Sequence, residues 1–108
     1  MAAITLTRAE HGKSIEAHVG DVITVTLNEN PTTGFRWAID KSDDVDVVAL
    51  SSSEYAAAPR SRVGKGGRRV VTFEVRKTGT STIQLKLWRE WEGDQSVTQR
   101  FAVKLLVR

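Results

Sequence analysis

Val22-Ile23-Thr24-Val25-Thr26-Leu27 is the stretch that decides the fold of this 108-residue chain. Apolar and polar side chains alternate along it, so Ile23, Val25 and Leu27 share one face of an extended strand and the two threonines share the other. β-Branched residues favour a pleated, half-buried strand of this kind. The stretch therefore predicts a strand with one face in a hydrophobic core.

The same alternation continues on both sides of this strand, and apolar patterns with the period of a helix are absent. A further strand is expected over residues 45–50, although its largely apolar composition does not settle which face is buried. Residues 51–67 are too long for a plain connection unless they hold an extra edge strand or a functional loop. The residues expected to form the other apolar faces are Ile4, Leu6, Ile15, Ala17, Val19, Trp37, Ile39, Val71, Phe73, Val75, Ile83, Leu85, Leu87, Phe101, Val103, Leu105 and Val107.

Short strands separated by regular turn signals predict a single all-β domain over residues 1–108. We expect an immunoglobulin-like β-sandwich of about seven to eight antiparallel strands. A closed barrel of about six or seven strands is the alternative.

Composition narrows the function further. The chain has no cysteine, which removes disulfides, thiolate metal sites and a cysteine nucleophile. No apolar run is long enough for a spanning helix, and the first residues do not resemble a signal peptide. We therefore expect a cytoplasmic protein, or a periplasmic or secreted one if a leader has been removed. A monomer is the default, and we expect it to bind neither nucleic acid nor membrane.

The net charge of +3 comes from one segment of the chain. A basic run and a separate acidic cluster are both expected to be solvated loops and not binding patches. The basic residues are Arg60, Arg62, Lys65, Arg68 and Arg69, and the acidic ones are Asp40, Asp43, Asp44 and Asp46.

Neither an enzyme nor a bound cofactor or metal is expected. His11 falls in a turn and His18 on an outward face, so both should be exposed. The aspartate cluster lacks the glycine and the final glutamate of a calcium loop, and the glycines of residues 64–67 lack the spacing of a nucleotide-binding loop.

Three loops of unusual composition should lie at one end of the domain. If consecutive strands alternate in direction, residues 28–34, 51–67 and 89–96 emerge at the same end. In the third, Trp88 and Trp91 would face opposite sides of an extended strand, so at least one should lie off the core. Tryptophan beside Arg89 combines two residue types that are enriched among binding hot spots.

The first of these loops has the most restricted backbone. Pro31 fixes its own φ and disfavours a helical conformation for Asn30, and Gly34 can adopt a positive φ without a Cβ clash. Thr32 and Thr33 between them are stiff at χ1. The stretch predicts a short, pre-shaped projection with small polar tips.

Three motifs resemble those of the chagasin-like inhibitors of papain-family cysteine proteases, the chagasin family. Asn30-Pro31-Thr32-Thr33-Gly34-Phe35 matches the motif Asn-Pro-Thr-Thr-Gly-aromatic in full, and Gly64-Lys65-Gly66-Gly67 matches Gly-x-Gly-Gly. Arg89-Glu90-Trp91 is similar to Arg-Pro-Trp, except that Glu90 stands where proline is usual. Order and spacing agree across essentially the whole chain.

The resemblance implies an immunoglobulin-like fold and a reversible, tight-binding inhibitor whose partner is a papain-like cysteine protease. It implies that Thr32 and Thr33 lie over the catalytic cysteine, that residues 64–67 lie on the non-primed side of the cleft, and that Arg89 and Trp91 pack on the primed side. Glu90 is expected to loosen the third loop and to let Arg89 pair locally. The alternative is a non-inhibitory immunoglobulin-like adhesion or carbohydrate-binding module.

Overall fold

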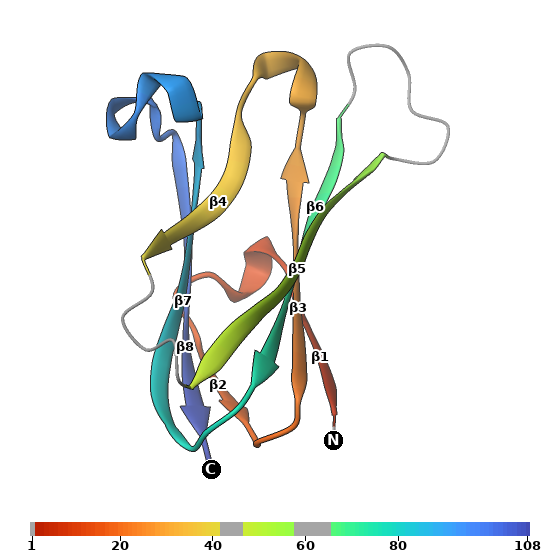
Figure 1. Cartoon of the computed structure of the whole chain (residues 1–108), viewed down its shortest axis with the longest axis vertical. Coiled ribbons are helices and arrows are strands. Elements are labelled where there is room, and N and C mark those ends of the chain that lie inside the picture. The colour runs from red at the N-terminus through yellow and green to blue at the C-terminus, as the bar shows by residue number, and fades with distance from the viewer. Residues whose placement is uncertain (1, 42–46, 58–65) are drawn as a thin grey trace.

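The computed structural model describes residues 2–41, 47–57 and 66–108, and these form two β-sheets packed face to face (Figure 1). The first sheet contains, in order, β1 (Ala3–Leu6), β3 (Val22–Glu29), β6 (Gly67–Val75) and β5 (Val48–Ala57). The second contains β2 (Ser14–Ala17), β8 (Gln99–Val107), β7 (Gly79–Trp88) and β4 (Arg36–Lys41). No strand pairing joins the two sheets within these residues. The predicted sandwich is confirmed, and the closed barrel is excluded.

Successive strands alternate in direction along the chain, as expected, but their pairing is mixed. β1 pairs with β3, and β2 pairs with β8, in parallel; the other four pairings are antiparallel. The expectation of a wholly antiparallel sandwich is therefore wrong at these two edges. The reason is topological, because the chain crosses to the second sheet between β1 and β2 and returns for β3. β1 and β3 consequently run in the same direction side by side.

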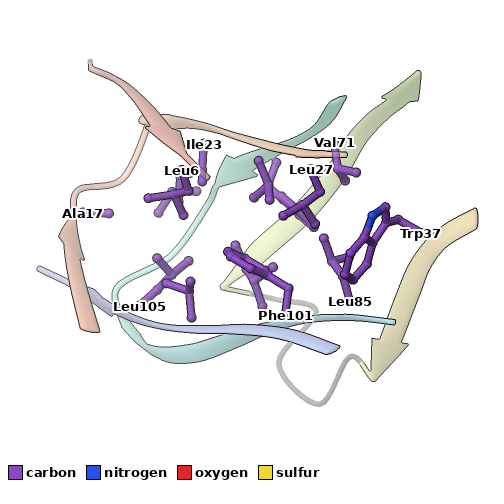
Figure 2. Packing of buried hydrophobic residues seen from close by; sticks show 14 of the residues in the cluster. Leu6, Ala17, Ile23, Leu27, Trp37, Val71, Leu85, Phe101 and Leu105 are labelled. Atoms are coloured by element: carbon purple, nitrogen blue, oxygen red, sulfur yellow. The ribbon is translucent and has the colours of Figure 1, made fainter. Parts of the chain in front are cut away.

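The core lies between the inward faces of the two sheets, and Figure 2 shows its two layers meeting. Ile23, Phe101 and Leu105 have no exposed surface, and Trp37 closes the core beside Leu85. Burial alternates residue by residue along β3, β6 and β8, which is the pattern of strands with one face in the core. The core prediction is thus confirmed for the central strands.

The edge strands depart from the prediction. β5 begins at Val48, later than expected, and continues to Ala57, so the first part of residues 51–67 belongs to an edge strand, which was one of the two possibilities left open for this segment. Ile39 was expected to be buried but is 37% exposed. Its direction is right, since it lines a hollow of about 340 Å³ with Trp37 and Leu85. β4 and β5, the edge strands on this side, belong to different sheets and are not paired, so the hollow is not covered.

Both ends of the chain lie at the pole opposite the β3–β4 connection (Figure 1). Asp21, in the turn before β3, is buried and accepts hydrogen bonds from the backbone N–H groups of His18 and Ala2, each at 2.9 Å. The N–H of Arg108 donates to the Ala17 carbonyl at 3.0 Å. In the described part of the chain, no helix is long and apolar enough to cross a membrane.

Candidate functional site

Three connections lie at one end of the sandwich: loop 1 (residues 30–35) between β3 and β4, loop 2 (residues 58–66) between β5 and β6, and loop 3 (residues 89–98) between β7 and β8. Figure 1 shows that β3 and β7 end, and β4 and β6 begin, at this same end. Within loop 2 only Gly66 belongs to the described residues; the predicted site residues Gly64 and Lys65 lie outside them, as do Arg60, Arg62, Asp43, Asp44 and Asp46. The shared end agrees with the strand alternation read from the sequence.

Loop 1 is folded by its own polar groups. Asn30 Oδ1 accepts hydrogen bonds from Thr32 N at 3.1 Å and Thr32 Oγ1 at 2.7 Å, and the Asn30 carbonyl accepts from Thr33 N at 3.2 Å and Thr33 Oγ1 at 2.8 Å. These bonds form the 3-10 turn η2 (Pro31–Thr33), which asparagine begins in the manner of a helix N-cap. Gly34 follows with a φ of 81°, a value that favours glycine. Thr32 and Thr33 are exposed at the tip.

Loop 2 meets loop 1 through Gly66, and the contact is made by backbone. A Cβ atom added to Gly66 would lie 2.7 Å from Asn30 Cα and 2.9 Å from Asn30 Cβ, and it would also clash with the Glu29 carbonyl oxygen. Only glycine fits this approach. Gly66 therefore makes a close backbone contact within the chain. Gly67, the first residue of β6, is buried.

Loop 3 meets loop 1 from the opposite side through Arg89. Arg89 Nε donates to the Thr33 carbonyl at 3.1 Å, and its guanidinium carbon lies 4.5 Å from the centre of the Phe35 ring. The same guanidinium pairs with Glu92 at 3.3 Å, so the local pairing expected for Arg89 is confirmed. Arg89 therefore joins two loops of the same molecule.

Trp91 lies in the short 3-10 turn η3 (Glu90–Glu92) and is 72% exposed. Trp88 ends β7 and is half-buried, with Lys86 Nζ 3.7 Å from the centre of its ring. Both tryptophans thus lie off the core. The prediction that they face opposite sides of one strand is wrong, because β7 ends before Trp91. The exposed indole stands beside loop 1, where a partner can reach it.

The neck of loop 3 is held by Ser96. Its hydroxyl accepts a hydrogen bond from Arg89 N at 2.9 Å and lies 2.7 Å from the Gly93 carbonyl and 3.0 Å from the Arg89 carbonyl. Lys86 adds a second tie, with its Nζ 3.0 Å from Asp94 Oδ1. Loop 3 therefore has internal supports that the motif comparison alone did not reveal.

A polar cluster lies beneath the loops and was not predicted from the sequence, and the prediction that Arg69 lies in a solvated loop is wrong. Arg69 lies in β6 and forms a buried ion pair with Glu29 at 2.7 Å. Both residues extend the inward phase of their strands, beyond Leu27 and Val71 respectively. This alternation could have predicted that both residues are buried, but charged residues are normally expected at the surface.

No catalytic or metal site is evident in the described residues. They contain no group of three or more histidine, cysteine, aspartate or glutamate residues that could hold a metal ion. His11 and His18 are both exposed, as predicted, and His11 Nδ1 accepts a hydrogen bond from the Ala102 backbone N–H at 3.0 Å. The arrangement is suited to contact with another molecule.

Comparison with known proteins agrees with this geometry. Chagasin from Trypanosoma cruzi is 28% identical over 103 residues, covering 93% of this chain and 94% of that protein. Amoebiasin-2 from Entamoeba histolytica is 26% identical over 103 residues, covering 95% of this chain and 84% of that protein. The crystal structure of a cysteine protease inhibitor from Entamoeba histolytica superposes with a TM-score of 0.82 at 26% identity, covering 99% and 96% of the two chains.

Residues 16–105 match the family described as chagasin family peptidase inhibitor I42. This match spans the strands that carry all three loops. The fold, the loop arrangement and the family match lead to one conclusion: the chain belongs to the chagasin family of peptidase inhibitors.

Proposed function

We propose that this protein is a reversible, tight-binding inhibitor of papain-like cysteine proteases and that loops 1, 2 and 3 form its binding surface. One observation carries the proposal: Gly66 packs against Asn30 on one side of loop 1, and Arg89 of loop 3 donates a hydrogen bond to the Thr33 carbonyl on the other. Such contacts shape loops 1 and 3 and hold Gly66 against loop 1 before any partner arrives. Prior ordering lowers the entropic cost of association.

We place loop 1 over the catalytic cysteine of the protease, loop 2 on the non-primed side of the cleft and loop 3 on the primed side. Thr32, Thr33 and Trp91 are exposed residues of this surface. Large exposed aromatic side chains commonly supply much of the binding energy at interfaces. Asn30, Gly66 and Arg89 instead give the surface its shape, because their contacts are made within the chain.

Loop 1 can occupy the cleft without being cut. Attack by a cysteine thiolate requires a carbonyl carbon at bonding distance, with its oxygen turned toward hydrogen-bond donors of the enzyme. The Asn30 carbonyl already accepts bonds from Thr33, and the Thr33 carbonyl already accepts one from Arg89. Turning the Asn30 oxygen toward the enzyme would break bonds of the 3-10 turn, and turning the Thr33 oxygen would break its bond to Arg89. The loop therefore blocks the nucleophile while staying out of attack geometry.

An inhibition panel tests the proposal. Papain and cathepsin L should show saturable inhibition, trypsin should be unaffected, and mass spectrometry should recover the inhibitor uncleaved. Thr32→Arg should weaken inhibition, since the exposed tip then carries a bulky charge. Thr82→Arg is the matched control, because Thr82 is exposed in β7 and lies outside the three loops. Papain-like enzymes that stay fully active at micromolar protein would contradict the proposal and favour a non-inhibitory binding module.

A further inference from the structure

A buried ion pair lies directly beneath loops 1 and 2. Glu29 is the last residue of β3 and its side chain is 1% exposed; Arg69 is the third residue of β6 and its side chain is 8% exposed. Arg69 Nη2 lies 2.7 Å from Glu29 Oε2, and Arg69 Nε lies 3.2 Å from each carboxylate oxygen. Both oxygens of the carboxylate therefore bind one guanidinium, which fixes the orientation of the two side chains.

The same carboxylate also links the two sheets. Glu29 Oε1 accepts a hydrogen bond from the backbone N–H of Trp37 at 2.7 Å, and the indole Nε1–H of Trp37 donates to the Asn28 carbonyl at 2.9 Å. Trp37 belongs to β4 in the second sheet, whereas Glu29 and Arg69 belong to the first. Loop 1 is thus closed at its base by two hydrogen bonds between the strands that enter and leave it.

Stability alone does not explain a charged pair here. Glu29 and Arg69 stand where the inward phases of β3 and β6 would place apolar residues. Removing two charges from water is costly, and well-packed apolar residues often replace a buried ion pair without loss of stability. An apolar pair, however, could not accept the Trp37 backbone N–H. The carboxylate supplies geometry that a purely apolar core would lack.

We propose that Glu29 and Arg69 are positioning residues, which fix loop 1 relative to Gly66 and the start of β6 before the protease binds. This inference rests on the proposed inhibitory function. Arg69 orients the Glu29 carboxylate, Glu29 holds Trp37, and the base of loop 1 cannot open. Gly66, three residues before Arg69, then packs against Asn30, the residue after Glu29. Neither charged side chain needs to touch the protease.

The test separates positioning from folding. The double variant Glu29→Met, Arg69→Met replaces the pair with apolar chains of similar length, and the control is Glu74→Met, Arg76→Met, which removes an exposed ion pair whose side chains are 54% and 61% exposed. Thermal unfolding and inhibition of papain are measured for both. The buried double variant should still unfold cooperatively, with a lowered Tm because the buried Trp37 N–H loses its acceptor, and its inhibition constant should rise about tenfold or more from the cost of ordering loop 1 on binding. The control should inhibit like the parent.

Amide hydrogen exchange of the unchanged protein gives a readout that needs no protease. The Trp37 amide should be protected as strongly as amides in the core strands, and this protection should be lost in the buried double variant. A folded double variant that inhibits like the parent would overturn the inference. If the double variant fails to fold, rapid exchange of Trp37 N–H in the parent would overturn it instead. A parent protein that inhibits no papain-like enzyme would refute the proposed function. The hydrogen-exchange result alone would then decide whether Glu29 and Arg69 hold the base of loop 1.

Discussion

The indole of Trp91 lies against the α-carbon of Gly34, so closely that a Cβ atom on Gly34 would come within 2.7 Å of Trp91 Cη2 and 3.2 Å of Cζ2. An exposed side chain of loop 3 is thereby seated on the backbone of loop 1. The two loops form one continuous surface, and a substitution in either loop should alter the conformation of the other.

Gly34→Ala should displace Trp91 and weaken inhibition of papain about tenfold. The variant also carries a positive-φ cost of about 1–2 kcal/mol. Gly12→Ala is the control, since Gly12 has a φ of 82° but nothing within 4 Å of an added Cβ. Both variants should lose similar thermal stability, and only Gly34→Ala should bind papain more weakly. Equal inhibition by the two would contradict the contact between the loops.

Trp91→Ala should leave folding intact and impair binding. The side chain is 72% exposed, so little core packing is lost, whereas truncating a central aromatic at an interface commonly costs about 2 kcal/mol or more of binding energy. Leu50→Ala, which changes another exposed apolar residue away from the three loops, is the comparison. Thermal unfolding together with the inhibition constant checks both, and a Trp91→Ala protein of undiminished potency would remove the indole from the interface.

Ser96→Ala should loosen loop 3. Removing the Ser96 hydroxyl leaves the Arg89 backbone N–H without its hydrogen-bond partner. Such a loss costs about 1–3 kcal/mol for a buried group and less for this half-buried one. Inhibition should weaken more than thermal stability, because the hydroxyl supports a loop that is proposed to bind the protease. Ser14→Ala serves as control, since Ser14 is exposed in β2. Unchanged inhibition by Ser96→Ala would show that the loop keeps its shape without the hydroxyl.

Glu90→Pro should rigidify loop 3. Glu90 is the first residue of η3, where proline fits, and Arg89 before it is extended, with φ −100° and ψ 111°, as a residue preceding proline prefers. A compatible proline stabilises by about 0.4–1 kcal/mol through the unfolded chain. Glu90→Ala removes the carboxylate without restricting φ, so a rise in Tm seen only with proline would establish the effect. A lower Tm for proline than for alanine would mean that the loop needs another backbone conformation.

Acidification should destabilise the protein through Asp21. Hydrogen bonds from the backbone N–H groups of His18 and Ala2 hold the pKa of this carboxyl below its usual value of 3.8. A lowered folded-state pKa gives stability that is fully present above the unfolded-state pKa and is lost as the pH falls through the folded-state pKa. Thermal midpoints measured from about pH 5 to pH 2 should therefore fall, and the fall should be shallower for Asp21→Asn than for the control Glu74→Gln. Parallel curves for the two variants would exclude Asp21 as the source.

The sequence predicted the central strands well because one-sided burial leaves a strict alternation, as in Val22–Glu29 and Gln99–Val107. It predicted the edges poorly. Ser51 and its neighbours in β5 are mostly exposed, so hydrophobicity carries little information there, and hydrogen bonds to β6 alone define the strand. Ile39 followed the correct phase, but no pattern reveals whether the opposite edge will cover it.

The loops were located from their motifs, and the family match confirms that the chain is an inhibitor and not an enzyme. What the sequence could not give was the pairing of Glu29 with Arg69, which stand 40 residues apart. A charged residue is buried only where a partner satisfies it, and an inward phase cannot name that partner. Charge clustering therefore misassigned Arg69, although its phase with Val71 was correct.

The placement of Ala2 and Arg108 at the pole remote from the three loops has a practical consequence. A carrier protein, a fluorophore or a solid support can be attached beside Ala2 or Arg108 while the three loops proposed to bind the protease point away from the attachment. The molecule is therefore suited to immobilisation as an affinity reagent for capturing active papain-like enzymes, and the attachment point need not be moved to another part of the chain.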